Sequence, residues 1–251
     1  MDKNRLNESA LLVEKEDWKK TQRQNKMKKL LTIASPIIML LLWEFLSRTA
    51  IINPIFFPAP SLILETLFNM GATGELLEHI QISLYRILAG FLLGVIPAIA
   101  LGLFIGMYSP IRHFFQPLIM ALMPIPPLAM LPIILPVVIN TAAGVMNIDK
   151  IYTDVAKNYG AKPKDFFFKI ALPGSLPVML EGIQMGQAIA LLTIVAAEMI
   201  GATSGIGYVI WMNYKAFLLP QMFVGLVLIS FFGYLFSLII RGLQSKLVPW
   251  K

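Results

Sequence analysis

The stretch Leu218–Ile240, LLPQMFVGLVLISFFGYLFSLII, decides the fold class of this 251-residue chain. It contains no charged side chain and is longer than the roughly 20 residues that a helix needs to cross a bilayer. Its apolar residues follow one another without the alternation in polarity that a membrane β-strand shows. The stretch therefore predicts a membrane-spanning helix.

The rest of the chain repeats this pattern. Hydrophobic residues make up 57% of the sequence and charged residues only 14%, with a mean hydropathy of +0.72. A soluble domain of this size needs a more polar surface, so the composition predicts an all-α integral membrane protein. The other predicted spans are about 30–46, 83–107 and 176–200, and a proline-rich apolar segment covers 117–145.

The charged residues indicate how the chain is organised. Residues 1–29 are polar and end in a lysine cluster beside the first span, which predicts a cytoplasmic leader, with the membrane domain at 30–251. The net charge of +7 lies beside apolar segments, which favours the lipid bilayer over nucleic acid as a partner. The chain has no cysteine and two isolated histidines, so we expect no metal site. No cleavable signal peptide is apparent.

Glycine pairs in the second span predict close helix packing. Gly90 and Gly94, and then Gly102 and Gly106, are each four residues apart. This spacing places two small residues on one helix face, where a neighbouring backbone can approach closely.

A polar segment at about 146–173 contains the most specific motif. It reads Asp154-Val155-Ala156, three residues, Gly160, nine residues, and then IALP at 170–173. The small Ala156 allows a close approach, and Gly160 permits the left-handed conformation that ends a helix. Pro163 suits the first turn of the helix that follows. The segment therefore predicts two short helices joined by a glycine turn.

This motif resembles the cytoplasmic loop of ABC importer permeases, which reads Glu-Ala-Ala, three residues, Gly, nine residues, Ile-x-Leu-Pro. Asp154 and Val155 depart from that pattern, although the spacing is kept. Segments including 56–61, 124–129, 196–202 and 205–208 resemble the nitrate, sulfonate, taurine and bicarbonate branch. The resemblance covers about 30–247. It implies the type I importer permease fold and a docking site for an ATPase on this loop, with the coupling residues Asp154, Ala156, Gly160, Ile170, Leu172 and Pro173.

The resemblance also implies partners and a location. These are two ATPase subunits on the cytoplasmic side, an extracytoplasmic solute-binding protein, and a second permease copy in a homodimer. The place is the prokaryotic cytoplasmic (inner) membrane, crossed several times, with the N-terminus in the cytoplasm. Because the chain has no Gly-Lys dipeptide and hence no phosphate-binding Walker loop, we expect no directly bound cofactor and ATP use by the partner. A small anion or organic sulfonate is the implied solute.

Polar residues in the span at about 176–200 are candidates for lining the translocation path. A carboxylate at Glu198 is costly inside a membrane unless it is paired, hydrogen-bonded or facing water. A structural salt bridge or a capping role is the alternative for this residue. Gln184, Gln187 and Thr193 lie in the same span, and the spacing of Gln184, Gln187 and Glu198 predicts one shared face. Interhelical hydrogen bonding is the alternative for the glutamines.

The number of crossings indicates that a sixth span is missing. If the leader and the 146–173 loop are both inside, the segment 117–145 must cross twice or not at all. Its length does not allow two helices of roughly 20 residues each. We expect roughly 20 to 25 residues to be absent between about Leu131 and Pro136, with a re-entrant hairpin as the alternative. The absence has three explanations: a natural deletion, an engineered deletion, or an omission from the sequence. A transport-incompetent deletion variant of a permease is the alternative function that follows from it.

Two other function classes compete with a permease. A membrane enzyme would need a catalytic motif such as His-Glu-x-x-His or paired intramembrane aspartates, and the sequence has neither. A non-ABC helical channel or assembly subunit would not need the loop motif. Stimulation of a partner ATPase favours the permease, and proteolysis or ion conductance by the chain alone favours a competitor.

Overall fold

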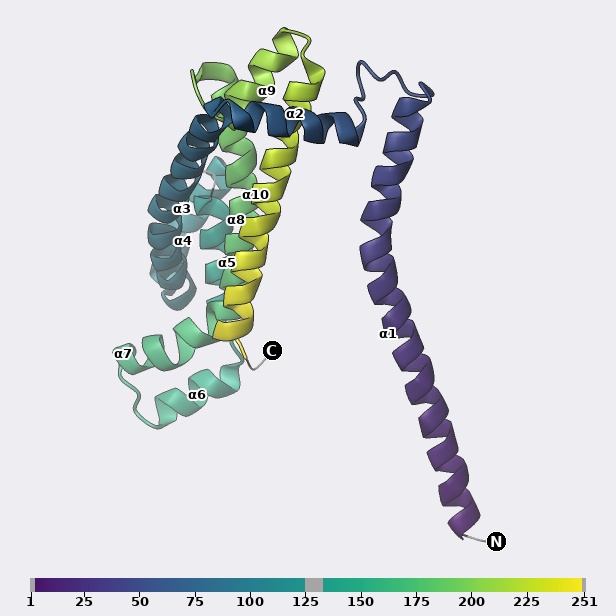
Figure 1. Ribbon diagram of the computed structural model, residues 1–251. Coiled ribbons are helices and arrows are strands. Elements are labelled where there is room, and N and C mark those ends of the chain that lie inside the picture. The colour runs from purple at the N-terminus through teal and green to yellow at the C-terminus, as the bar shows by residue number, and fades with distance from the viewer. Residues whose placement is uncertain (1–2, 125–132, 250–251) are drawn as a thin grey trace. The chain divides into compact units, whose positions relative to one another are not determined.

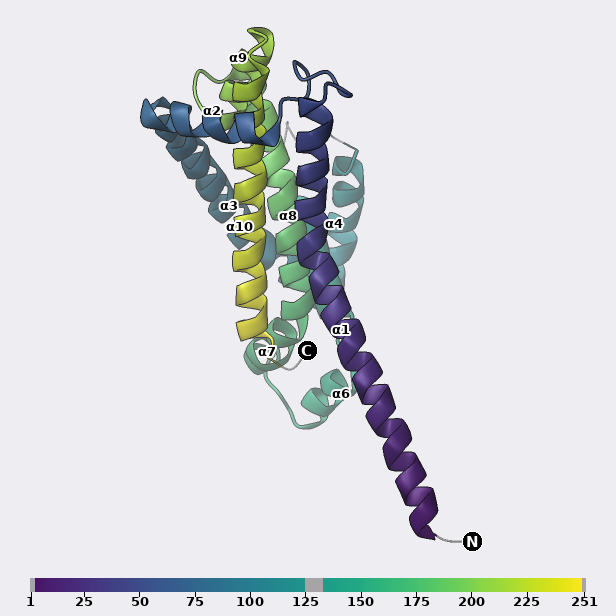
Figure 2. The same ribbon diagram turned by 45° about the vertical axis from the view of Figure 1, so that its right-hand side comes forward.

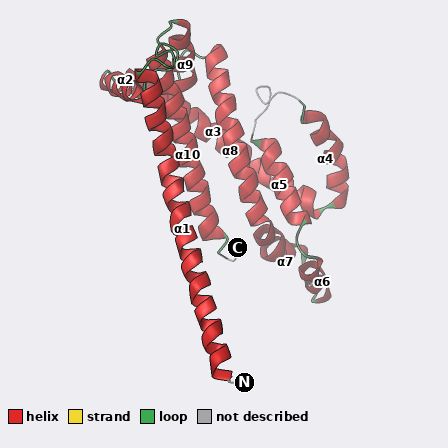
Figure 3. Ribbon diagram, turned by 90° about the vertical axis from the view of Figure 1, so that its right-hand side faces the viewer, coloured by secondary structure: helices red, strands yellow, loops and turns green. Residues whose placement is uncertain are grey.

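The structure, a computed structural model, describes residues 3–124 and 133–249. Every regular element in these residues is a helix, which confirms the all-α prediction (Figure 3). The chain divides into two units, Met1–Glu65 and Thr66–Lys251.

The first unit contains one long helix and a turn that folds back on its end. Helix α1 covers Lys3–Arg48, so the polar leader and the first span form one continuous helix. In its last turn, buried Ser47 donates a hydrogen bond to the carbonyl oxygen of Phe57, in the turn that follows, at 2.7 Å. Glu44 pairs with Arg48 and accepts a hydrogen bond from the backbone N–H of Ser61 at 3.0 Å. Glu44 thereby caps α2, which covers Pro60–Ala72.

In chain order, the helices of the second unit after α2 are α3 (Glu75–Met107), α4 (Ser109–Leu122), α5 (Ile134–Met146), α6 (Lys150–Asn158), α7 (Pro163–Phe166), the π-helix η2 (Phe167–Ala171), α8 (Leu172–Gly201), α9 (Ile206–Lys215) and α10 (Leu219–Leu247). The longer helices of the second unit, α3, α8 and α10, run along one another, and the short helices α6, α7 and α9 lie at its two ends (Figure 1).

Helix α5 packs between α3 and α8 because glycines remove the side chains that would separate the backbones. A Cβ atom on Gly102 would lie 2.6 Å from the Cβ of Thr141, and one on Gly106 would lie 2.5 Å from the Cβ of Val145. Gly94 packs on Ile133 in the same way, whereas no atom of the described residues lies within 4 Å of a Cβ atom on Gly90. The packing role is confirmed for three of the four predicted glycines.

These contacts also fix the directions of the helices. Gly94, Gly102 and Gly106 of α3 meet residues that are each 39 positions later in the chain, so α3 and α5 run parallel. On α8, Gly182 meets Asn140 and Gly186 meets Ile133, so α8 runs antiparallel to α5. The end of α5 therefore lies at the same end of the unit as the end of α3.

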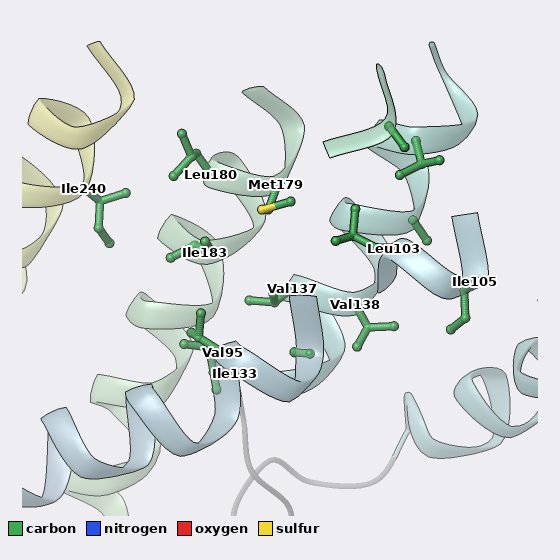
Figure 4. Close-up of a cluster of buried hydrophobic side chains, with 14 of the residues drawn as sticks. Val95, Leu103, Ile105, Ile133, Val137, Val138, Met179, Leu180, Ile183 and Ile240 are labelled. Atoms are coloured by element: carbon green, nitrogen blue, oxygen red, sulfur yellow. The ribbon is translucent and has the colours of Figure 1, made fainter. Parts of the chain in front are cut away.

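The core lies where these three helices meet (Figure 4). Val137 and Val138 of α5 are almost fully buried between Leu103 of α3 and Met179 of α8. Helix α4 has no fully buried residue, but its residues Ile111, Phe115 and Ile119, on one face, pack against this core. Large apolar side chains on the outer faces of α3, α8 and α10 are exposed, as expected of helices surrounded by lipid.

Four helical stretches among the described residues are long and apolar enough to cross a membrane: Lys20–Arg48, Glu75–Met107, Pro163–Gly201 and Leu219–Leu247. Helices α5 and α6 would form a fifth together, but they bend by 64° at their junction. Because α3 and α5 are parallel, the chain returns between them through α4. At 1.5 Å per residue, α4 and α5 are each only about 20 Å long, whereas a bilayer core is about 30 Å thick.

The two described helices that flank the predicted omission, α4 and α5, called the α4–α5 hairpin below, are therefore each too short to span a bilayer. Leu131 and Pro132 lie outside the described residues, while Ile133–Pro136 begins α5 or directly precedes it. Helices α3 and α5 end at the same end of the unit, and the segment 146–173 follows there. The hairpin therefore keeps this segment on the side of the membrane that the count of crossings requires.

Candidate functional site

The segment 146–173, called the docking loop below, lies at the end of the second unit opposite α9 (Figure 2). Helix α6 begins with Asp149, whose carboxylate accepts a hydrogen bond from the N–H of Ile151 at 2.9 Å. It ends at Gly160, which has a φ of +67°. There the N–H groups of Gly160 and Ala161 donate to the carbonyl oxygens of Lys157 and Ala156. This pattern ends a helix with a left-handed glycine, and it confirms the predicted turn.

The second short helix also begins as predicted. Pro163 occupies the first turn of α7, where its missing N–H costs no hydrogen bond. Helix α7 then continues into the π-helix Phe167–Ala171 and directly into α8. The sequence analysis did not predict this π-helix. Single π turns inside α-helices are frequent at functional sites.

The six predicted coupling residues occupy different environments. Asp154 is exposed, and Ile170, Leu172 and Pro173 are half-buried. Ala156 is only 6% exposed, and it lies in the wall of a cavity of about 480 Å³. The ends of α3 and α5 line this cavity together with the docking loop. The small side chain of Ala156 therefore lets α6 approach the protein's own helix ends.

Arg112 of α4 lines this cavity and binds the end of α3. Its side chain donates to the carbonyl oxygens of Ile105 at 3.2 Å and Gly106 at 2.7 Å. These are among the last carbonyls of α3, which have no partner within the helix. Arg112 therefore caps α3 and fixes the end of the helix on which the docking loop rests.

The outward face of α6 is apolar. Four side chains on it are largely exposed, and Tyr159 is 88% exposed; the residues, called the loop face below, are Ile151, Tyr152, Val155 and Tyr159. Ile151, Val155 and Tyr159 are four residues apart and so lie along one side of the helix. A polar helix with an uncovered apolar stripe is suited to docking against another protein surface.

At the opposite end of the unit, Glu198 is the centre of a polar cluster. It is 3% exposed, and its carboxylate accepts hydrogen bonds from Ser83, Arg86 and the N–H of Gly207, each at 2.9 Å. Arg86 also donates to the carbonyl oxygen of Ser204 at 2.8 Å. These residues, the Glu198 cluster, tie the turn at 204–207 to α3. The geometry gives Glu198 the salt-bridge and capping role, and its role in a pathway stays a prediction.

The tight turn explains why glycines occur here. Gly205 has a φ of +121°, and a Cβ atom on it would lie 2.4 Å from the Glu198 carboxylate. Sequence reasoning missed Arg86 as the partner of Glu198. The signal was present, because an arginine inside an apolar span must find a partner.

The other candidate pathway residues of α8 have different surroundings. Gln187 is buried like Glu198, whereas Gln184 is half-buried and donates to the hydroxyl of Ser237 in α10 at 3.2 Å. Thr193 donates to the carbonyl oxygen of Ile189 in its own helix. Gln184 thus makes the interhelical hydrogen bond that was its alternative role.

Comparisons with known proteins cover most of the chain. Residues 90–251 match the family described as "Binding-protein-dependent transport system inner membrane component". The taurine transport system permease protein of Escherichia coli is 29% identical over 245 residues, covering 88% of this chain and 89% of that protein. A nitrate import permease protein of Leptolyngbya laminosa is 30% identical over 237 residues, covering 84% and 85%. A Bacillus subtilis protein named for aliphatic sulfonates transport is 29% identical over 236 residues, covering 86% of each.

These alignments are longer than the part of this chain that they contain. The taurine permease aligns over 245 positions, but 88% of 251 residues is about 221, which leaves about 24 positions without a residue here. For the nitrate permease, 237 positions stand against about 211 residues, which leaves about 26. For the Bacillus subtilis protein the difference is about 20. Relatives thus carry extra residues in about the number that the missing span requires.

Proposed function

Because this chain belongs to the family of binding-protein-dependent transport system inner membrane components, we propose that it forms the translocation path of an ATP-driven importer. It is the multi-pass permease subunit of an ABC importer in the inner membrane, not an enzyme. The family match, which includes the docking loop, is the observation that carries this conclusion.

ATP hydrolysis belongs to a separate ATPase that docks on the loop face from the cytoplasm. The uncovered apolar stripe of α6 supports this, because an amphipathic helix in water gains stability when a partner covers it. The sequence has no Walker loop, so ATP acts on the partner and this chain binds no cofactor directly. Asp154, Gly160, Ile170, Leu172 and Pro173 support the position of this face and transmit movement of the ATPase to α8.

The remaining partners follow from the family. A solute-binding protein delivers the solute on the outer side, and a second copy of the chain completes the pathway. With the docking loop inside, the N-terminus is also cytoplasmic. Glu198, Gln184, Gln187 and Thr193 remain the proposed pathway residues.

The proposed solute is a small anion or an organic sulfonate. The relatives named for taurine, aliphatic sulfonates and nitrate support this class. Growth on one such solute as sole sulfur or nitrogen source, with and without this chain, distinguishes among the members of the class.

A pair of single cysteines tests the orientation. Lys162→Cys places a thiol in the docking loop, and Lys215→Cys places one at the end of α9, at the other end of the unit. The native chain has no cysteine, so the background is clean. A non-permeant thiol reagent should label Lys162→Cys only from the cytoplasmic side and Lys215→Cys only from the outside. Labelling of Lys162→Cys from the outside would contradict docking of a cytoplasmic ATPase.

A second candidate is a transport-incompetent variant of such a permease. The short α4–α5 hairpin and the 20 to 26 unmatched alignment positions both favour it. This variant keeps the docking loop and therefore still engages an ATPase. Its pathway is incomplete, because neither α4 nor α5 is long enough to cross the bilayer.

A further inference from the structure

A cavity of about 350 Å³ lies between the adjoining ends of α2 and α3 and the helices α9 and α10. It is at the end of the second unit opposite the docking loop (Figures 1 and 2). Its polar lining comes from Thr73, Glu75, His79, Tyr208, Asn213 and Gln221. None of these residues belongs to the coupling or pathway residues named above.

Three of the lining residues offer hydrogen-bond acceptors to the cavity. The side-chain oxygen of Gln221 is buried and accepts no hydrogen bond from the described residues. Asn213 uses its side-chain N–H to bond the carbonyl oxygen of Val209 at 2.8 Å, which leaves its own oxygen as an acceptor. Glu75 adds a carboxylate, which only accepts when ionised.

The described lining carries no lysine or arginine charge, and its donors are uncharged groups such as the hydroxyl of Tyr208 and the amide N–H groups of Gln221. The His79 Nδ1 accepts a hydrogen bond from the N–H of Gly205 at 3.2 Å, and the imidazole lies 5.8 Å from the ring of Tyr208. The cavity is therefore negative and rich in acceptors, so it matches a ligand that donates and carries positive charge.

We propose that this cavity binds a small solute through a primary ammonium group. An ammonium has three donors and no acceptor, which matches the carboxylate of Glu75 and the carbonyl oxygens of Asn213 and Gln221. Leu76, Val209 and Met212 supply apolar walls for the carbon chain of the solute. A buried acceptor without a donor is unfavourable, so binding satisfies Gln221 as well as the solute.

Through His79 the cavity adjoins the turn that the Glu198 cluster holds. The N–H of Gly205 donates to His79, and the N–H of Gly207 donates to Glu198. A solute in the cavity thus touches the residues that set the position of this turn. That the cavity faces the outside rests on the proposed function, whereas its ligand chemistry does not.

Thermal unfolding of the purified full-length protein in detergent tests the proposal. Ethylammonium chloride should raise the unfolding temperature saturably above a sodium chloride baseline of equal ionic strength, and sodium ethanesulfonate should not. Glu75→Gln and Gln221→Met should each raise the ethylammonium concentration that gives half of the maximal shift in unfolding temperature at least tenfold. Glu78→Gln is the matched control, because Glu78 lies in the same first turn of α3 but does not line the cavity.

Gln221→Met also separates a binding role from a structural one. It replaces an unpaired acceptor by an apolar side chain of similar size, so this variant should unfold at or above the wild-type temperature. The proposal is overturned if ethylammonium has no effect, if ethanesulfonate stabilises equally, or if Gln221→Met keeps the wild-type response. None of these outcomes alters the thiol labelling of Lys162→Cys, so failure of this proposal is distinguishable from failure of the permease assignment.

Discussion

At the scale of single residues, the Glu198 cluster joins positions more than 100 residues apart in the chain. The carboxylate is buried, but Arg86 is 38% exposed, so water screens part of their attraction. The cost of losing Glu198 is therefore dominated by the groups left unpaired, above all the N–H of Gly207 and the guanidinium of Arg86.

We expect Glu198→Leu to lower the free energy of unfolding by about 2–3 kcal/mol, below the range for a fully buried pair because Arg86 is partly solvated. Glu198→Gln keeps an acceptor for Gly207 and should cost less. A double-mutant cycle with Arg86→Met, measured by unfolding in detergent, isolates the coupling between the two side chains. Additive single and double variants would show that the pair contributes nothing to stability.

At the scale of elements, the glycines of α3 show why a sequence pattern can be necessary without being sufficient. Gly90 and Gly102 belong to the same predicted pattern, but only Gly102 faces α5. A Cβ atom on Gly102 would lie 2.8 Å from the backbone oxygen of Val138, which cannot rotate away. The cost of adding a methyl group therefore depends on the neighbour and not on the spacing.

Gly102→Ala should destabilise the fold by about 1–3 kcal/mol, because the methyl group overpacks the α3–α5 contact. Gly90→Ala is the matched control and should be neutral or stabilising by up to about 1 kcal/mol, since alanine favours a helix more than glycine does. Unfolding in detergent measures both variants. Equal effects at the two positions would contradict the parallel packing of α3 and α5.

The loop face gives a prediction about association. Tyr159→Ser removes a side chain that makes almost no contact within the protein, so stability should not change. If Tyr159 is a central contact with the ATPase, truncation should weaken docking by about 2 kcal/mol, or roughly 30-fold. Co-purification and ATPase stimulation measure this effect.

Tyr85→Ser is the matched control for this experiment, since Tyr85 is another tyrosine with a largely exposed side chain but lies on α3. An equal loss of ATPase stimulation in both variants would argue against the loop face as the docking surface.

At the scale of the whole molecule, the length of the α4–α5 hairpin limits how completely the chain crosses the membrane. The parallel arrangement of α3 and α5 keeps the docking loop at the correct end of the unit, but two helices of about 20 Å leave the membrane incompletely crossed. Docking of an ATPase and transport of a solute can therefore be tested separately in this chain.

If the second candidate is correct and the chain is a transport-incompetent variant, it should bind a partner ATPase but import no solute in proteoliposomes. Insertion of the roughly 24 residues that the taurine permease has in excess, placed between Leu131 and Pro136, should supply both crossings and restore uptake. An insert of equal length made of polar residues is the control, because it cannot supply membrane crossings. Solute uptake by the chain without the insert would contradict the assignment of a missing span.

The membrane location, the helical class, the family and the glycine turn of the docking loop could all be predicted from the sequence. These features depend on local properties, since hydropathy over 20 residues and the φ preference of one glycine act within a short stretch of chain. Only the tertiary structure decided that Ala156 is buried against the protein's own helix ends, that Arg86 pairs with Glu198, and that α3 runs parallel to α5. Each of these depends on residues distant in sequence, whose meeting is set by how side chains pack together and not by any local pattern.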